Sequence, residues 1–578
     1  MTVVKNILII SLTRMGDLIQ NTPLIMGLRE KHPNAKITLM VSSDFESVVS
    51  LIPDINNAIV INLRQFKDSE KWEDKSWIKV YRYLESELDK VRNESFDLLV
   101  NLSHSRLSAL MVHYLKVKNI VGFYCNNFGD RMTGHPWMQY FGTEPFNRSF
   151  NEFNLVEIFS RSGGIDLAGK EIKVLKQEAD YLNKELSIEN LKKSYDQLVI
   201  GFQIGSSLEN RRWSTQSFAN LADLLIQELN VHILLFGVES ESKSAKEMMD
   251  LTCNKSRVTD FTGKTDLKQL SILLSGCDYL ITNDTGTMHL AAALNTKIIG
   301  LFFAHAHPFE TAPFSIGHLI IQPRLSCAPC SYGVHCNNII CIEKVIPEHI
   351  LSFLKGHIES ECWKLPSDLE NSEELNVYET VCSNQGIVSL KPLIKHPLQL
   401  NDVFRLAYAV LWRENLDVKI ITEFKVIIEQ LENYDFSKLV DFTETLGEKI
   451  RFLNKLEGYG KEGMRFCEKI IKSASGKNKS ALTLVKIGKD IDKLDEKIEL
   501  IGLAHPELKP ITDMFIKRKE NHIGNDIARL GRESLNGYQL LKRESKRMIE
   551  ILLEQEEQIS KYLIYNTHNS MSVAVPGR

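Results

Sequence analysis

The chain has 578 residues, of which 43% are hydrophobic and 25% charged, and its formal net charge is -4. One hydrophobic core does not grow to this size, so we expect two to four domains of an ordinary soluble protein. The slightly negative charge argues against a dedicated nucleic-acid binder, because binding to phosphates needs a surplus of Lys and Arg.

The N-terminal segment is predicted to be a first strand and not a signal peptide. Residues 1–11 lack a basic region and a small-residue cleavage site. Apolar runs such as residues 231–237 are too short to span a bilayer. We therefore expect a cytoplasmic protein, with any contact to the inner membrane peripheral. The ten cysteines of such a chain are expected to be reduced thiols.

Short β-branched runs alternate with amphipathic segments through much of the chain. The predicted strands are residues 7–11, 36–41, 58–61, 98–102 and 119–122, then 198–202, 232–236, 279–282 and 297–301. Helices are expected at residues 23–31 and 77–91. This alternation predicts an α/β protein with two Rossmann-like domains facing a cleft, whose ligands bind at the carboxyl ends of the strands.

The pattern changes after a helix that begins at Pro347. A polar linker with a β-hairpin at residues 377–382 and 387–393 is followed by long segments rich in Lys, Glu, Leu and Ile. These segments predict a helical bundle or coiled coil, with breaks near Gly458 to Gly460, Gly476 and Pro506. The predicted domains are residues 1–180 and 195–360 (Rossmann-like), 361–400 (linker with hairpin) and 401–567 (helical extension).

The first candidate site follows the first strand, where Asp17 precedes a helix that Pro23 can open. Its carboxylate can take a proton from a hydroxyl nucleophile. The alternative is that Asp17 only caps the helix. The segment is not the glycine-rich dinucleotide motif, so nicotinamide or flavin binding is unsupported.

The second candidate site follows the first strand of the second half. A Gly205-Ser206-Ser207 turn offers N–H and hydroxyl donors to phosphate, and Arg211 or Arg212 adds charge and bidentate geometry. The alternative is a solvated basic turn.

The third candidate site connects a buried strand to an Ala-rich helix. Gly286 lets the backbone approach a ligand, and Asp284 or Thr285 can cap the helix. Free N–H groups at the helix start, with His289 one turn further, predict a seat for the diphosphate of a nucleotide. The alternative is an ordinary strand-to-helix connection.

A fourth candidate is a cluster of thiols. Its spacing, C-x2-C-x5-C-x4-C, suits a structural zinc or iron ion. The alternative is four reduced thiols in a loop. The four residues are Cys327, Cys330, Cys336 and Cys341.

Three motifs over about residues 5–358 resemble glycosyltransferase family 9, the ADP-heptose:lipopolysaccharide heptosyltransferases. They are Met15-Gly16-Asp17 with Thr22-Pro23, Arg211-Arg212-Trp213, and Asn283 to His289. The resemblance implies a GT-B fold and an inverting transfer of heptose from ADP-heptose that needs no metal at the reaction centre. Many members carry Lys in the phosphate-binding motif, where both basic residues here are Arg.

The resemblance also implies a role for each residue. Asp17 would be the general base, and Glu239 would contact the ribose. Asp284 would orient the sugar or a group on the phosphate side. The diphosphate would be bound by Ser206, Ser207, Arg211, Arg212, Thr285, Gly286 and His289. The acceptor would be an inner-core sugar of bacterial lipopolysaccharide. The helical extension leaves room for a protein acceptor or a homo-oligomer.

Two rival readings stay open. One is another cleft enzyme of this fold, such as a sugar-nucleotide epimerase or a transferase with a different donor. The other is a non-enzymatic scaffold.

Overall fold

The computed structural model describes residues 4–64, 76–178, 198–370, 372–417, 431–436, 443–475 and 481–572. The chain forms two compact units. Unit 1 comprises residues 1–122 and 154–394, and unit 2 comprises residues 123–153 and 395–578. Part of the predicted connection between the two α/β halves, residues 179–197, lies outside the described residues. The predicted domain boundaries stay a prediction.

The first sheet has the strand order β3-β2-β1-β4-β5-β6. Pairing is parallel from β3 to β5, as expected for βαβ units. The strands are β1 (Asn6–Ile10), β2 (Lys36–Ser42), β3 (Asn57–Ile61), β4 (Leu98–Asn101), β5 (Ile120–Cys125) and β6 (Arg131–Gly134). The helices between and after them in unit 1 are α1 (Met15–Gln20), α2 (Thr22–Lys31), α4 (Ser76–Arg92), α5 (Arg106–Leu115) and α7 (Leu155–Ser162).

The second sheet has the order β14-β13-β12-β11-β10-β7-β8-β9. Its strands are β7 (Val199–Gln203), β8 (His232–Phe236), β9 (Val258–Asp260), β10 (Tyr279–Asn283), β11 (Lys297–Leu301), β12 (Leu319–Pro323), β13 (Leu375–Cys382) and β14 (Val388–Pro392). Its helices are α9 (Thr215–Leu229), α10 (Ser242–Leu251), α11 (Leu267–Gly276), α12 (Gly286–Ala293), α13 (Pro308–Thr311) and α14 (Pro347–Ser360). The predicted hairpin is present as β13 and β14, and it extends this sheet because β13 pairs antiparallel with β12.

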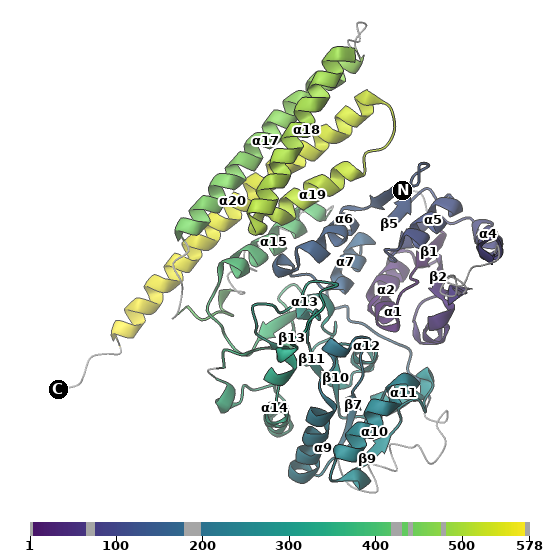
Figure 1. Ribbon diagram of the computed structural model, residues 1–578, viewed down its shortest axis with the longest axis vertical. Coiled ribbons are helices and arrows are strands. Elements are labelled where there is room, and N and C mark those ends of the chain that lie inside the picture. The colour runs from purple at the N-terminus through teal and green to yellow at the C-terminus, as the bar shows by residue number, and fades with distance from the viewer. Residues whose placement is uncertain are drawn as a thin grey trace. The chain divides into compact units, whose positions relative to one another are not determined.

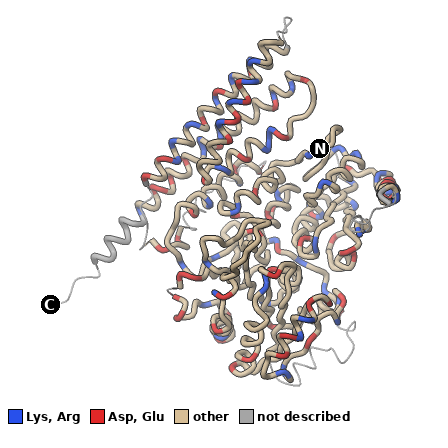
Figure 2. The backbone as a smooth tube through the Cα atoms, in the orientation of Figure 1, with Lys and Arg blue, Asp and Glu red and all other residues tan. Residues whose placement is uncertain are grey.

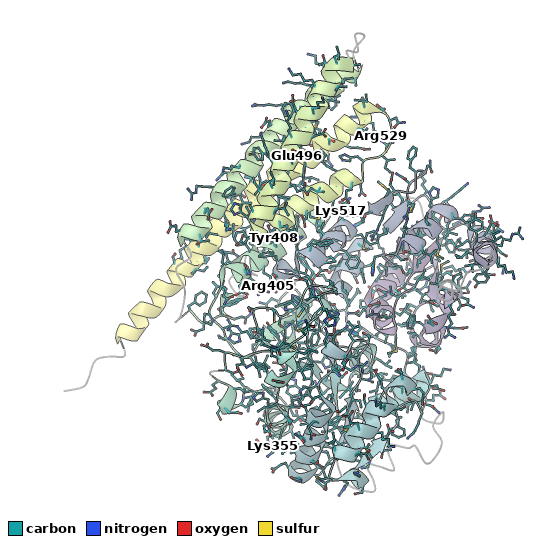
Figure 3. The ribbon with its side chains drawn as sticks, in the orientation of Figure 1. Lys355, Arg405, Tyr408, Glu496, Lys517 and Arg529 are labelled. Atoms are coloured by element: carbon teal, nitrogen blue, oxygen red, sulfur yellow. The ribbon has the colours of Figure 1, made fainter. Side chains whose placement is uncertain are left out.

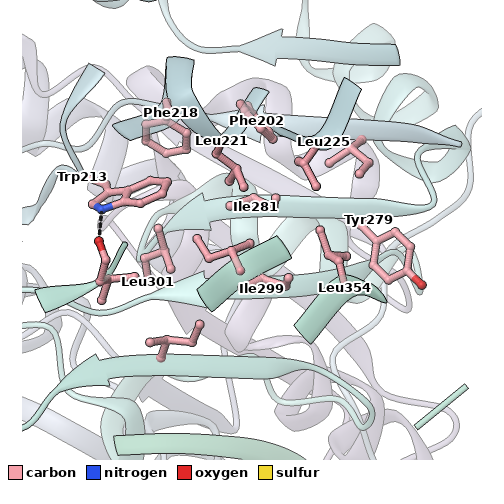
Figure 4. Packing of buried hydrophobic residues seen from close by; sticks show 14 of the residues in the cluster. Phe202, Trp213, Phe218, Leu221, Leu225, Tyr279, Ile281, Ile299, Leu301 and Leu354 are labelled. Atoms are coloured by element: carbon pink, nitrogen blue, oxygen red, sulfur yellow. Dashed lines mark hydrogen bonds between the residues drawn. The ribbon is translucent and has the colours of Figure 1, made fainter. Parts of the chain in front are cut away.

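Helices cover the second sheet, so its central strands are apolar on both faces. All five residues of β7, β8 and β10 are buried, which is typical of parallel strands in α/β proteins. Trp213 is buried at one end of this core and donates a hydrogen bond from Nε1 to the Val345 carbonyl at 2.9 Å (Figure 4). These buried residues form the core around the second sheet, whose strands and helices are labelled in Figure 1. Two sheets of this kind give unit 1 the α/β architecture of the GT-B fold.

Unit 2 is mostly helical, as the pattern after Asp402 predicts. Its helices are α6 (Pro136–Thr143), α15 (Leu400–Leu416), α17 (Thr443–Ser475), α18 (Ala481–Ala504), α19 (Lys509–Glu520) and α20 (Ile527–Ser572). Arg405 and Tyr408 on α15 are labelled in Figure 3. Tyr408 is fully buried and donates a hydrogen bond to the Glu507 carbonyl at 2.7 Å. Among the described residues, no helix is long and apolar enough to cross a membrane.

The predicted helix break near Gly458 to Gly460 is wrong, because α17 runs without interruption from Thr443 to Ser475. The glycines allow close packing instead. A β carbon at Gly460 would lie 2.8 Å from Lys542 Cβ, and one at Gly463 would lie 2.3 Å from Tyr538 Cδ1. Tertiary contact with α20 therefore outweighs the low helix propensity of glycine. The break near Pro506 is present between α18 and α19, whereas Gly476 lies outside the described residues.

Substitution Gly463→Ala should destabilise unit 2 by about 1–3 kcal/mol, because the new methyl group overlaps the Tyr538 ring. Thermal unfolding of the full chain, followed by helical circular dichroism, measures the effect. Gly458→Ala in the same helix is the matched control, since a β carbon there meets no atom within 4 Å, and alanine should add up to about 1 kcal/mol. Equal midpoints for the two variants would contradict the packing argument.

Candidate active site

The loop after β1 carries Asp17 to the carboxyl edge of the first sheet. Its backbone is held there by Ser103, which follows β4 and whose Oγ accepts the Leu12 N–H at 2.7 Å. Asp17 lies in the first turn of α1 and is partly buried. Its carboxylate accepts the Arg14 N–H at 3.2 Å. The capping interaction of the alternative reading is therefore present, and it leaves the second carboxylate oxygen for other chemistry.

Helices α1 and α12 meet through two glycines. A β carbon at Gly16 would lie 3.0 Å from His289 Cδ2 and 3.2 Å from Gly286 Cα. A β carbon at Gly286 would lie 2.7 Å from Met15 Cε. Only glycine allows this approach of backbone to backbone. The structure thus brings the first and third candidate sites together, with Asp17 and His289 on the two sides of the contact.

A buried amide joins the second and third candidate sites. Asn283, the last residue of β10, accepts the Trp213 N–H on Oδ1 at 3.0 Å. Its Nδ2 donates to the carbonyls of Ile204 at 3.0 Å and Gly205 at 3.2 Å. One side chain therefore holds both ends of the loop between Ile204 and Trp213. The sequence motif contains Asn283, but its partners are distant in the chain and motif reading missed this role.

The loop held by Asn283 places Arg211 against Asp284. Arg211 Nη2 donates to the Asp284 carboxylate and, at 2.8 Å, to its carbonyl. Both side chains are less than a tenth exposed. Thr311 on α13 donates to the same carboxylate at 3.2 Å, a contact that the sequence did not reveal. Arg212 is partly exposed and donates from Nε to the Ser206 carbonyl at 2.8 Å.

Four polar atoms in these loops are buried without a hydrogen-bond partner among the described residues. They are Ser206 Oγ, Asn210 Oδ1, Arg211 Nε and His289 Nδ1. Buried polar groups are normally paired, so these atoms suit contact with a polar ligand. Ser207 is exposed, and Thr285 and Gly286 are partly exposed at the start of α12. This set of donors fits an oxyanion such as a phosphate.

Burial is the main influence on His289, which is 4% exposed. Burial lowers the pKa of His289, and the negative charges of Asp284 and Asp17 partly oppose that shift. The imidazole is therefore neutral near pH 7 and can donate one hydrogen bond and accept another.

Two carboxylates follow β8. Glu239 is exposed, and its side chain lies against Gly263, where a β carbon would be 2.1 Å from Glu239 Oε2. Glu241, which sequence reading missed, lies at the ends of β7 and β8 and accepts hydrogen bonds from Gln203 Nε2 at 3.2 Å and the Val238 N–H at 3.0 Å. Glu241 thus lies at the carboxyl edge of the second sheet, beside the loop between Ile204 and Trp213, which we call the phosphate-type loop. The ribose role of Glu239 stays a prediction.

The four predicted metal ligands line one small cavity of about 20 Å³, together with Asn210 and Ala304. Cys341 is buried and Cys327 is exposed. Burial raises the pKa of the Cys341 thiol, and the neighbouring thiols Cys336 and Cys327 add to the shift. Within the described ranges, no group of three or more His, Cys, Asp or Glu side chains is placed to hold a metal ion. The four thiols therefore line the same cavity, but their side chains are not arranged to coordinate a metal ion.

Two Rossmann-like sheets whose carboxyl-end loops meet at one polar site are the architecture of the GT-B fold. The model of glycosyltransferase family 9 (heptosyltransferase) matches residues 86–337. Lipopolysaccharide core heptosyltransferase OpsX of Haemophilus influenzae is 22% identical over 326 residues, which cover 54% of this chain and 82% of that protein. Lipooligosaccharide heptosyltransferase 2 of the same organism is 26% identical over 339 residues, covering 55% and 88%.

Among solved structures, a family 9 glycosyltransferase from Veillonella parvula covers 62% of this chain and 98% of its own, with 19% identity and a TM-score of 0.48. The sequence matches confirm the resemblance of the motifs. Over residues 86–337 the chain resembles glycosyltransferase family 9, and these matches indicate a glycosyltransferase enzyme.

Substitution Asn283→Ala should weaken both the fold and nucleotide binding. It leaves the buried Trp213 N–H and two carbonyls unpaired, at a cost of about 1–3 kcal/mol for each group left without a partner, and it releases the loop that carries Arg211. Thermal unfolding and calorimetric titration with ADP measure the two effects. Asn220→Ala is the control, because Asn220 is exposed and, within the described ranges, its side chain only accepts a hydrogen bond from Gln216 on the same helix. Unchanged ADP affinity in Asn283→Ala would contradict the role of Asn283 in positioning the loop that carries Arg211.

Proposed function

We propose that this chain transfers heptose from ADP-heptose to a hydroxyl of an inner-core lipopolysaccharide sugar, with inversion at the anomeric carbon. The match of residues 86–337 to the family 9 model supports a glycosyltransferase, and the names of the relatives support heptose and lipopolysaccharide. The observation that carries the proposal is the convergence of Arg211, His289 and the start of α12, with buried polar atoms that have no protein partner.

The donor diphosphate would occupy the third candidate site. The free N–H groups at the start of α12 point along the helix axis and favour a negative charge. Arg211 would contact the same phosphates, with Arg212, Ser206 and Ser207 beside them. Arg211 also pairs with Asp284, and that carboxylate holds the guanidinium in one orientation. Glu239 would contact the ribose.

Asp17 would act as general base. In an inverting transfer the acceptor oxygen loses its proton to the base and attacks the anomeric carbon, while the bond from that carbon to the diphosphate oxygen breaks. The developing negative charge leaves on the diphosphate, where Arg211 and the α12 N–H groups stabilise it. These protein groups supply the charge that a metal ion would otherwise supply, so we propose that the transfer step needs no cofactor.

An exchange of the Asp17 carboxylate for an amide tests the base. Asp17→Asn keeps an oxygen to accept the Arg14 N–H but cannot take a proton at neutral pH. Transfer from ADP-heptose should fall by about 10²–10⁴-fold, while calorimetric affinity for ADP stays within about twofold of the native chain. Transfer at the native rate would leave Asp17 as a helix cap only. Loss of ADP binding would instead point to misfolding of the site.

Donor choice is tested by titrating the same protein with ADP, UDP, GDP and ADP-heptose. Selective binding of the two adenine compounds supports the proposal. A preference for UDP or GDP favours the transferase with another nucleotide sugar, and turnover of ADP-heptose without an acceptor favours an epimerase. Transfer to a protein acceptor but not to a lipopolysaccharide core would identify a protein-modifying enzyme. A chain that binds none of these compounds is a scaffold.

We also propose that the four-cysteine cavity holds a structural zinc or iron ion. The meeting of four thiols at one cavity supports this site, although closure around an ion requires the side chains to move. Mass spectrometry of the purified chain should find about one metal ion, and a Cys327→Ser/Cys330→Ser variant should lose it. Cys253→Ser, at an exposed cysteine outside the cavity, should keep it. A metal-free native chain would favour the reduced thiols.

A further inference from the structure

One end of the helical bundle in unit 2 exposes apolar side chains beside cationic ones. Helix α17 ends here at Ser475 and α18 begins at Ala481. Helix α20 begins at Ile527 at the same end, because a β carbon at Gly531 would lie 3.0 Å from Ile471 Cγ1 on α17. We call this region the bundle tip and define it as residues 468–475, 481–489 and 526–533.

Three aliphatic side chains of the bundle tip face solvent. Leu482 is 85% exposed, Val485 58% and Ile527 45%. Leu482 and Val485 are three residues apart and therefore share one face of α18. That face is opposite the packed side, where Ile487 and Ile491 are buried. A soluble helix gains nothing from such exposure, so these side chains suit an apolar contact outside the bundle.

The bundle tip is cationic. It contains six basic and three acidic side chains, and Arg529 is labelled in Figure 3. Its basic residues are Lys469, Lys472, Lys486, Lys489, Arg529 and Arg532. Arg529 pairs with Glu533, while Lys472, Lys486 and Arg532 are exposed and form no ion pair among the described residues.

We propose that the bundle tip binds the surface of an anionic phospholipid bilayer. Leu482, Val485 and Ile527 would enter the boundary between headgroups and acyl chains, while the surrounding Lys and Arg contact the phosphates. The contact is peripheral. The inference deepens the proposed function, since a lipopolysaccharide acceptor is itself embedded in a membrane. A protein partner with an acidic groove is the competing occupant, and the lipid is favoured because few aliphatic side chains are exposed and the tip has a net positive charge.

The other end of α18 provides an internal control. Leu500 and Leu503 are 62% and 63% exposed, and they lie about 22 Å or more along the helix from Val485. Residues 490–504 carry five acidic and two basic side chains, and Figure 2 shows the interleaved charges of these helices, with Glu496 labelled in Figure 3. Leu500 and Leu503 are also exposed, but the acidic side chains around them should repel an anionic membrane.

Co-sedimentation of the full chain with vesicles tests the proposal. Vesicles of phosphatidylcholine with about one third phosphatidylglycerol should pellet the protein, and vesicles of phosphatidylcholine alone should not. Leu482→Ser/Val485→Ser should weaken the apparent affinity by about tenfold, and Lys486→Glu/Arg532→Glu by at least as much. The matched control Leu500→Ser/Leu503→Ser should bind like the native chain. Helical circular dichroism confirms that each variant is folded.

Two results would overturn the proposal. One is a native chain that pellets with neither vesicle, which would leave the tip to a protein partner. The other is equal weakening by the Leu482/Val485 and Leu500/Leu503 pairs, which would show nonspecific adsorption. Both readouts are lipid binding and not sugar transfer. Titration with ADP in the same preparation therefore separates a failure of this inference from a failure of the proposed function.

Discussion

The amide of Asn283 is the constraint on which the geometry of the candidate active site depends. It uses its acceptor and both donor directions on backbone groups of the loop between Ile204 and Trp213. Arg211 and Trp213 also anchor this loop through their side chains, and Asn283 adds hydrogen bonds to the backbone at both of its ends. With these contacts, Arg211 lies against Asp284 and the phosphate-type loop faces the start of α12. A single buried amide thus converts two separate motifs into one site.

The charged side chains of that site neutralise one another when no anionic ligand is bound. Two carboxylates, Asp17 and Asp284, lie near a neutral buried imidazole, and one of them already neutralises Arg211. Because Arg211 pairs with Asp284, no buried cation is left unpaired when the diphosphate is absent. The contact of Gly16 with Gly286 keeps Asp17 close to the start of α12, because any side chain there would separate the two helices.

Glycine has opposite uses in the two units. In unit 1 it brings two helix starts together at the candidate active site. In unit 2, Gly460 and Gly463 bring α17 against α20 within one uninterrupted helix. The same residue that weakens an isolated helix therefore strengthens a helix pair when the removed side chain would have clashed. This packing leaves charged residues on the outer faces of the bundle and confines its exposed aliphatic side chains to a few positions.

The sequence alone determined the strands that have a strong local signal and the order of the chemical motifs. Strands β8 (His232–Phe236) and β11 (Lys297–Leu301) have the predicted bounds, because a strand buried on both faces needs an apolar run. The tertiary structure decided the rest. Asn283 and Trp213 are 70 residues apart, Thr311 reaches Asp284 from another helix, Glu241 lies beside the phosphate-type loop, and α17 continues through its glycines. These features depend on long-range packing, which overrides local propensity and which no short window of residues encodes.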